Sequence, residues 1–217
     1  SAILLLLCFD LTYIENLTML LDAQLSQLVL VDYQEKLMPA MHNAAPVLAN
    51  AMRLAQAAQW IGVPVWGSEQ CPQKLGGNAP ELRALCRQTV AKLAFSGVHE
   101  GLLDLVRPPV RASGNARSLP RHLQKKQDEP AVGQTVVIAG CEAHICLLQT
   151  ALELMEEECE VWVVTDACSS RTEANRDAAF DRLAGAGAEL VTTEMVLFEW
   201  MRSAEHEHFK AIQALVK

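Results

Sequence analysis

The residue best suited to act as a catalytic group is Cys146, in the stretch 135–151, TVVIAGCEAHICLLQTA. The apolar run at 136–139 is typical of a buried parallel strand, and Gly140 ends it. Helical spacing begins near His144, which places Cys146 in the first turn of a helix at the carboxyl end of a strand. Backbone N–H groups at such a position favour an anion, so the Cys146 thiol is predicted to ionise to a nucleophilic thiolate. The alternative interpretation is a small buried hydrophobic residue.

Two charged residues stand at strand positions that would bring them next to this thiol. Asp32 ends the apolar run 28–31, and in a Rossmann-like strand order the ends of the first and fourth strands lie side by side. A carboxylate there can accept the thiol proton and pass it to a leaving group. Lys92 lies in the otherwise apolar strand 90–95, so it either occupies an exposed edge or points at a counter-charge. An ammonium near both groups would favour the thiolate and the carboxylate.

The elements that must position these residues alternate along the chain from residue 27. Apolar runs predict strands at 28–31, 63–66, 90–95, 136–139, 161–165 and 189–192. Helical spacing predicts helices at 44–60, 80–86, 99–106, 145–157, 173–184, 194–200 and 206–216. This alternation predicts an α/β fold, a three-layer α/β/α sandwich around a Rossmann-like doubly wound parallel sheet of about six strands.

The length of 217 residues fits a single α/β domain, which we place at 27–217. Residues 1–26 are interpreted as an N-terminal extension or an upstream-derived tail, with Met19 as a candidate natural start. The apolar run at 3–7 is too short to span a bilayer and lacks the features of a signal peptide. The polar, Pro-rich and locally basic stretch 107–133 exceeds an ordinary connection, so it is predicted to be a functional loop or partly disordered.

Charge and cysteine content exclude several classes of protein. The formal net charge of −8 disfavours nucleic acid as a partner, because no Lys/Arg stripe is available to neutralise phosphates. No membrane association is expected either. The seven cysteines include no CxxC pair, which excludes zinc-ribbon and thioredoxin-like proteins. Scattered thiols fit a reducing compartment, so a cytoplasmic protein is expected.

Taken together, these features resemble the isochorismatase-like cysteine hydrolase superfamily, and most of all its isochorismatase domain-containing hydrolase branch. The resemblance rests on LVLVDYQEKL, GSEQCPQKLGGNAPEL, KLAFS, GCEAHICLLQTALEL and VVTDACSSRTEANRDAAFDRLAGAGA. It implies a catalytic triad with Asp32 as base, Lys92 as electrostatic partner and Cys146 as nucleophile. It further implies a non-proline cis peptide at Cys141–Glu142, an oxyanion hole from the N–H groups of Glu142 and Cys146, and a homo-oligomer, a dimer or larger.

Departures from the family pattern limit which reactions of the superfamily this chain is expected to catalyse. Nicotinamidases of the superfamily hold a metal with an aspartate and two histidines after the second strand, whereas this chain reads WGSEQCPQKLGG there. No catalytic metal and no other cofactor are therefore expected. His206 and His208, at i and i+2 in an expected helix, are interpreted as a surface pair whose rings point apart. Vinyl-ether-cleaving members lack the nucleophilic cysteine, so Cys146 favours attack on an amide-like C–N bond through a thioester.

Several residues near strand ends or the nucleophile are candidates to bind a small-molecule substrate, namely Gln34, Gln70, Phe95 and His144. Each of them is equally well explained as a capping or packing residue. Arg171, after the fifth strand, could meet an acidic substrate or a subunit interface.

Two other functions use the same residues. The chain could be a catalytically inactive member that binds a small molecule or acts as a scaffold. It could also be a redox sensor that pairs Cys141 with Cys146, provided that the two Cα atoms lie within about 7 Å. The sequence does not identify the substrate.

Overall fold

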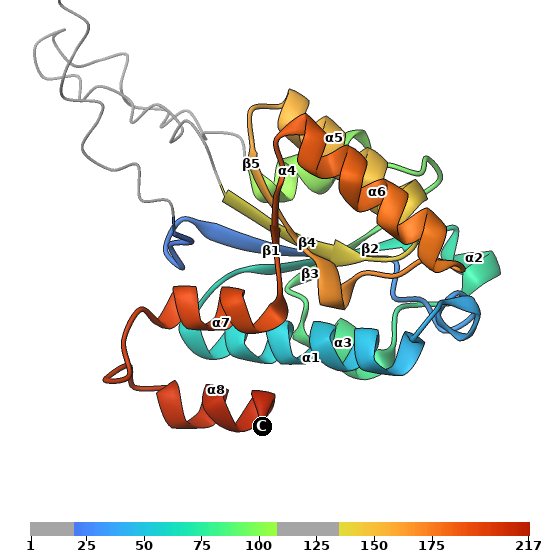
Figure 1. Cartoon of the computed structure of the whole chain (residues 1–217). Coiled ribbons are helices and arrows are strands. Elements are labelled where there is room, and N and C mark those ends of the chain that lie inside the picture. Colours follow the sequence, from blue (N-terminus) through green and yellow to red (C-terminus); the bar gives the residue numbers. More distant parts are fainter. Residues whose placement is uncertain (1–19, 108–134) are drawn as a thin grey trace, which may run out of the picture.

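The computed structural model describes residues 20–107 and 135–217, which form one six-stranded sheet covered by helices (Figure 1). The strand order is β3-β2-β1-β4-β5-β6, and each neighbouring pair is parallel. The strands are β1 (Ser26–Val31), β2 (Val65–Gln70), β3 (Gln88–Lys92), β4 (Thr135–Gly140), β5 (Glu160–Val164) and β6 (Glu189–Val191). The order reverses between β1 and β4, so the predicted doubly wound topology is confirmed.

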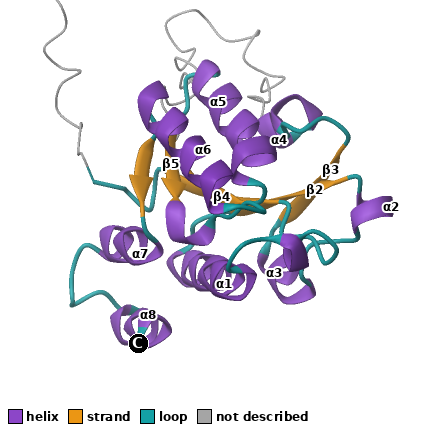
Figure 2. Ribbon diagram, turned by 45° about the vertical axis from the view of Figure 1, so that its right-hand side comes forward, coloured by secondary structure: helices purple, strands orange, loops and turns teal. Residues whose placement is uncertain are grey.

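Helices form the two outer layers of the sandwich. The α-helices are α1 (Ala44–Ile61), α2 (Pro72–Leu75), α3 (Pro80–Leu85), α4 (Leu102–Val106), α5 (Leu148–Glu156), α6 (Glu173–Ala186), α7 (Thr193–Met201) and α8 (Phe209–Val216). Helices α4, α5 and α6 cover one face of the sheet, whereas α1, α3 and α7 cover the other (Figures 1 and 2). Helix α8 packs outside α1 and α7. Short 3-10 turns lie at Met38–Ala40, Val98–Glu100 and Thr165–Ala167.

The centre of the sheet is apolar because its two middle strands are covered on both faces. Every residue of β1 and of β4 is buried, as expected for parallel strands between two helical layers. Helix α1 ends at Gly62, whose φ of 95° is the left-handed conformation that favours glycine at a helix C-terminus. The central strands therefore bring their carboxyl ends, and the residues that follow them, to one edge of a rigid core.

Three predicted boundaries differ at the residues that matter for the site. The second strand was expected to end at residue 66 but continues to Gln70, because its ladder with β3 runs on to the Gln70–Lys92 pair. The third strand was expected to reach residue 95 but stops at Lys92. The Glu100 carboxylate accepts hydrogen bonds from the N–H groups of Leu93 and Ala94 and so turns the chain out of the sheet.

The helix expected to start at residue 145 instead begins with a π-helical turn, Ala143–Leu147, followed by α5. The Leu147 N–H donates to the Glu142 carbonyl five residues earlier, at 3.3 Å. π-helical turns of this kind are found frequently at functional sites.

The helix predicted for His206 and His208, with rings pointing apart, was wrong. Helix α8 begins only at Phe209, so both histidines precede it, and their ring centroids lie 5.7 Å apart instead of pointing away from each other. The His206 Nδ1 accepts a hydrogen bond from the His208 N–H, which the non-helical backbone allows.

Two predicted segments lie partly outside the described residues, namely the N-terminal extension 1–26, of which 20–26 are described, and the insertion 107–133, of which only Arg107 is described. The described chain begins at Leu20, and Leu21 is buried, with its N–H donating to the Glu199 carboxylate at 2.8 Å. Within the described ranges, no helix has the length and apolar character needed to cross a bilayer.

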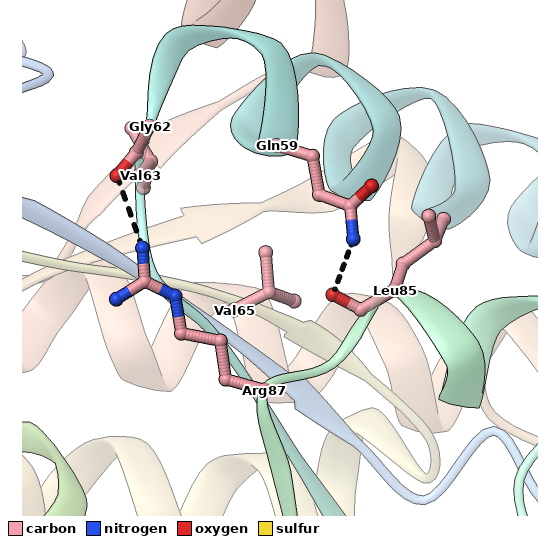
Figure 3. Close-up of a pocket in the computed structure, with 6 residues that line it drawn as sticks. All are labelled: Gln59, Gly62, Val63, Val65, Leu85 and Arg87. Atoms are coloured by element: carbon pink, nitrogen blue, oxygen red, sulfur yellow. Dashed lines mark hydrogen bonds between the residues drawn. The ribbon is translucent and has the colours of Figure 1, made fainter.

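A cavity of about 250 Å³ lies at the amino end of β2, at the edge of the sheet away from Asp32 (Figure 3). It separates the end of α1 from the chain between α3 and β3. Both polar side chains drawn in Figure 3 are bonded to the protein's own carbonyls, Gln59 to Leu85 O and Arg87 to Gly62 O. The two side chains thus connect the secondary structure elements around the cavity, and none of the residues that line it is a nucleophile or an acid.

Gly140, at the end of β4, permits the close approach of β4 to β1. A Cβ atom there would lie 2.3 Å from Val31 O and 2.5 Å from Val31 Cβ. We expect Gly140→Ala to lower the free energy of unfolding by about 3 kcal/mol or more, because the two buried strands must separate. Urea unfolding followed by circular dichroism measures the loss.

Gly185→Ala is the matched control, because nothing lies within 4 Å of a Cβ at this position in α6. It should raise the stability by about 0.5–1 kcal/mol through helix propensity. Equal effects of the two substitutions would contradict the close approach at Gly140.

Candidate active site

The site is built around a buried ion pair between Lys92 and Asp32. Lys92 is the last residue of β3, and Asp32 directly follows β1, with β2 between the two strands. The Lys92 Nζ lies 2.7 Å from Asp32 Oδ2, and both side chains are fully buried. Of the two alternatives that the sequence left open for Lys92, an exposed edge or a counter-charge, the structure shows the second.

Each member of the pair has further hydrogen-bond partners. Besides Asp32, the Lys92 Nζ donates to Gln70 Oε1 at 2.8 Å and to the Phe95 carbonyl at 2.9 Å. An ammonium has three N–H donors, so all of them are used. The other Asp32 oxygen, Oδ1, accepts a hydrogen bond from Ser68 Oγ at 2.7 Å.

The backbone at Asp32 is itself unusual, with a φ of 54°. A left-handed conformation is uncommon outside glycine, and aspartate is one of the residues that tolerate it. The chain therefore leaves the extended conformation of β1 at the residue that carries the buried carboxylate.

Gln70, the last residue of β2, connects the ion pair to Cys146. Its Oε1 accepts from Lys92 and lies 4.0 Å from the Cys146 Sγ. Its Nε2 donates to the Leu93 carbonyl at 2.7 Å and lies 3.4 Å from the Cys71 Sγ. The structure thus brings together a carboxylate that follows β1, an ammonium at the end of β3 and a thiol in the turn before α5. Gln70, at the end of β2, lies between them.

Burial disfavours ionisation of the Cys146 thiol, contrary to the sequence prediction of a thiolate. Burial is the main cause that raises its pKa to about 12, and the nearby Asp32 carboxylate raises it further. The Lys92 ammonium acts in the opposite direction but does not outweigh these two effects. The helix start that suggested a thiolate lies inside the protein, where desolvation penalises the charged form.

The Cys141–Glu142 peptide bond is cis, at the position that the family resemblance implied. It joins the end of β4 to the π-helical turn that carries Cys146. The Glu142 carboxylate accepts from Arg171 Nε at 2.9 Å. Arg171 therefore pairs with a residue of this chain, beside the segment that precedes the nucleophile.

The chain is similar to known proteins of one family. Residues 26–195 match the family described as Isochorismatase domain. The chain belongs to the isochorismatase domain family. It is 34% identical over 192 residues to isochorismatase domain-containing protein 2A of Mus musculus, a similarity that covers 88% of this chain and 82% of the mouse protein.

Solved structures similar to this member of the isochorismatase domain family share its fold. The MAR1 ribonuclease of Caenorhabditis elegans has a TM-score of 0.71 at 29% identity, covering 90% of this chain and 91% of the nematode chain. The YcaC gene product of Escherichia coli, described as an octameric hydrolase of unknown specificity, has a TM-score of 0.71 at 22% identity, covering 93% and 96%. The predicted family and α/β/α fold are therefore confirmed, and membership of the family supports a hydrolase.

The four candidate substrate-binding residues take different places in this isochorismatase domain. Gln34 is buried, and its amide binds the Gln70 backbone and the Gly76 carbonyl, so it holds Gln70 in place. The Phe95 side chain is 53% exposed, and it is the Phe95 carbonyl that reaches Lys92. His144 is partly exposed, with Nδ1 2.9 Å from Ser170 Oγ.

Ser68 is a residue of the site that the sequence reasoning did not single out. It pairs with Val31 in the ladder of β1 and β2, one residue before Asp32. Its hydroxyl therefore reaches the neighbouring carboxylate. The signal that could have found it is a small polar residue at the carboxyl end of a buried strand next to an aspartate.

Cys141 and Cys168 are buried thiols at the end of β4 and after β5. Burial raises the pKa of Cys168 to about 12 and raises the pKa of Cys141 as well. Because the thiolate is the species that exchanges with disulfides, the raised pKa values of Cys141 and Cys146 disfavour the alternative of a redox sensor that pairs these two residues. Within residues 20–107 and 135–217, no group of three His, Cys, Asp or Glu side chains is arranged to hold a metal ion.

A double-mutant cycle tests the buried ion pair. Lys92→Met should lower the free energy of unfolding by about 3–5 kcal/mol, because it leaves the Asp32 carboxylate buried without its counter-charge. Asp32→Asn should destabilise for the same reason, and asparagine tolerates the left-handed backbone there. The double variant should be more stable than the sum of the two losses by about 2 kcal/mol, as measured by urea unfolding. Simple additivity would contradict the pairing.

The pH dependence of alkylation tests the state of the Cys146 thiol. Since its pKa is raised to about 12, the thiolate fraction is small near neutrality and grows until well above the range of a free thiol. The iodoacetamide rate at Cys146 should rise about tenfold per pH unit and show no plateau near pH ~8.5. The same cysteine in urea-unfolded chain is the control and should level off there. A plateau below about pH 8 in the folded protein would contradict the raised pKa and show that Cys146 is a thiolate at rest.

Proposed function

We propose that this protein is a metal-independent cysteine hydrolase that cleaves an amide-like C–N bond of a small molecule through a thioester. The observation that carries the proposal is the buried Asp32–Lys92 pair, connected through Gln70 to the Cys146 thiol. These groups supply a base, a fixed positive charge and a nucleophile, which are the parts that acyl transfer needs.

In the proposed acylation, the Cys146 Sγ attacks the substrate carbonyl carbon while its proton passes to the Asp32 carboxylate. Deprotonation during the attack fits a thiol whose pKa is raised to about 12, because little thiolate exists beforehand. The C–N bond then breaks, and the leaving nitrogen takes the proton from Asp32. The product is a thioester between Cys146 and the acyl group, plus ammonia or an amine.

In the proposed deacylation, water attacks the thioester carbonyl and gives its proton to Asp32. The C–S bond then breaks, and the proton returns to Sγ, so that the thiol is restored and a carboxylic acid is released. Both tetrahedral intermediates carry an oxyanion, to which we assign the N–H groups of Glu142 and Cys146. Loss of one such donor typically costs about 3–4 kcal/mol of transition-state stabilisation.

Lys92 has an electrostatic role in this proposal. Its three N–H donors are already bonded to Asp32, Gln70 and the Phe95 carbonyl, so none is left for the substrate. Its charge balances that of Asp32 and opposes the effect of the carboxylate on the pKa of the Cys146 thiol.

RNA is not the substrate that we propose, although the nematode relative is described as a ribonuclease. The net charge of −8 disfavours a polyanion, whose binding depends on neutralised phosphates. A homo-oligomer and a cytoplasmic location belong to the proposal as well, the first on the family resemblance and the second on the free thiols.

Cys146→Ala should abolish turnover and leave the fold intact. The assay is ammonia release from a panel of small amides and ureides, with the Cys146→Ala protein as the blank and circular dichroism to check folding. Cys159→Ala is the control, since this other buried thiol lies at the start of β5 and should be dispensable for turnover. Full activity of Cys146→Ala would overturn the mechanism.

A panel on which neither the parent protein nor Cys159→Ala releases ammonia would favour the alternative of a binding or scaffold protein over an amidase. Binding of the same compounds, measured by calorimetry, then distinguishes an inactive member from an enzyme with another substrate.

A further inference from the structure

The loop 93–97 follows β3, and its backbone contacts the side chains of Lys92 and Gln70. Its Phe95 carbonyl accepts from Lys92 Nζ at 2.9 Å, and its Leu93 carbonyl accepts from Gln70 Nε2 at 2.7 Å. The loop thus provides one of the three acceptors of the buried ammonium. If the loop moved, a buried N–H of Lys92 would lose its partner, and the ammonium would lose its fixed position.

Two carboxylates hold this loop from outside. Glu100 accepts from the N–H groups of Leu93 and Ala94 at 2.9 and 3.0 Å, and these two hydrogen bonds lower its pKa. Glu153 Oε2 accepts from Ser96 Oγ at 2.6 Å. The Ser96 hydroxyl in turn accepts from the Val98 N–H at 3.2 Å, so the serine is held on both sides.

Glu153 differs from Glu100 because it lies on the helix that follows the nucleophile. Helix α5 continues directly from the π-helical turn of Cys146, and Glu153 comes seven residues after this cysteine. Thr150 of the same helix accepts from the Gly97 N–H at 3.2 Å. Two hydrogen bonds therefore join helix α5, which follows Cys146, to the 93–97 loop, which binds the Lys92 ammonium.

We propose that Glu153 is a positioning residue, which links the helix that carries Cys146 to the 93–97 loop and so fixes the Lys92 ammonium relative to the thiol. The proposal rests on the proposed function, since it gives Lys92 an electrostatic role toward Cys146. The chain of contacts runs from Glu153 through Ser96 to the Phe95 carbonyl and Lys92. His99 Nε2 lies 3.9 Å from the same Glu153 oxygen, but its side chain is 69% exposed and is not part of this series of contacts.

The alkylation of Cys146 by iodoacetamide at about pH 9 reads the position of Lys92 without any substrate. In Glu153→Ala the loop loses the hydrogen bond that Ser96 donates, although Glu100 and Thr150 still hold its two ends. The Phe95 carbonyl is then held less firmly against Lys92, so the ammonium that favours the thiolate is no longer fixed beside it. We expect the rate to fall about threefold or more, which is half a pKa unit or more at the thiol. Glu153→Gln should restore the rate to within about twofold, because its amide oxygen can still accept from Ser96.

Glu156→Ala is the matched control, since this exposed glutamate lies on the same helix and should leave the rate unchanged. The melting temperature of each variant is measured in parallel. A Glu153→Ala protein that melts earlier but is alkylated at the parent rate, or faster, overturns the proposal and leaves Glu153 a purely structural role.

Lys92→Met separates failure of this inference from failure of the proposed function. If Lys92→Met slows alkylation of Cys146 and Glu153→Ala does not, the electrostatic role of Lys92 stands and the positioning role of Glu153 is wrong. If neither substitution changes the rate, Lys92 does not act on the thiol, and both the inference and that part of the proposed function are overturned.

Discussion

The contact between the Lys92 ammonium and the Asp32 carboxylate, 2.7 Å apart and fully buried, constrains the rest of the site. Two charges removed from water are tolerated only when each has its counter-charge and its hydrogen bonds. The ammonium therefore requires Gln70 and the Phe95 carbonyl, and the carboxylate requires Ser68. These partners come from β2 and the 93–97 loop. The register of the strands and the conformation of the loop must therefore both place hydrogen-bond partners next to the buried pair.

The same burial determines how the nucleophile behaves. A thiol at a solvent-exposed helix start would tend to ionise, but Cys146 is buried, with its pKa raised to about 12. Its reactivity then depends on a base within reach and on a fixed positive charge, and no longer on a preformed thiolate. In the proposed mechanism the ion pair supplies both groups. The arrangement of Asp32, Lys92 and Gln70 around one thiol thus fits the proposed acyl transfer at a buried edge of the sheet.

Much of this architecture was predictable, because parallel strands between two helical layers are marked by continuous apolar runs. The runs ending at Asp32 and Gly140 predicted β1 and β4 within two residues, and Gly62 marked the end of α1. The end of β3 was missed because it is set by the Glu100 carboxylate, seven residues beyond Leu93. The contact of Ser68 with Asp32 was also missed, since it depends on a neighbouring strand. Gln34 was named as a binding or packing residue, and the structure shows it bonded to the Gln70 backbone.

The order of strands and helices and the three residue types of the proposed triad follow from local properties of the sequence, namely hydrophobic periodicity and position at a strand end. Which of these groups touch, and how far burial raises the pKa of the Cys146 thiol, depends on the tertiary structure. Lys92 could have been an exposed strand residue, and Cys146 could have been a thiolate. Both outcomes depend on how much water the packed sheet and helices exclude, and burial is a property of the whole fold that no local stretch of sequence contains.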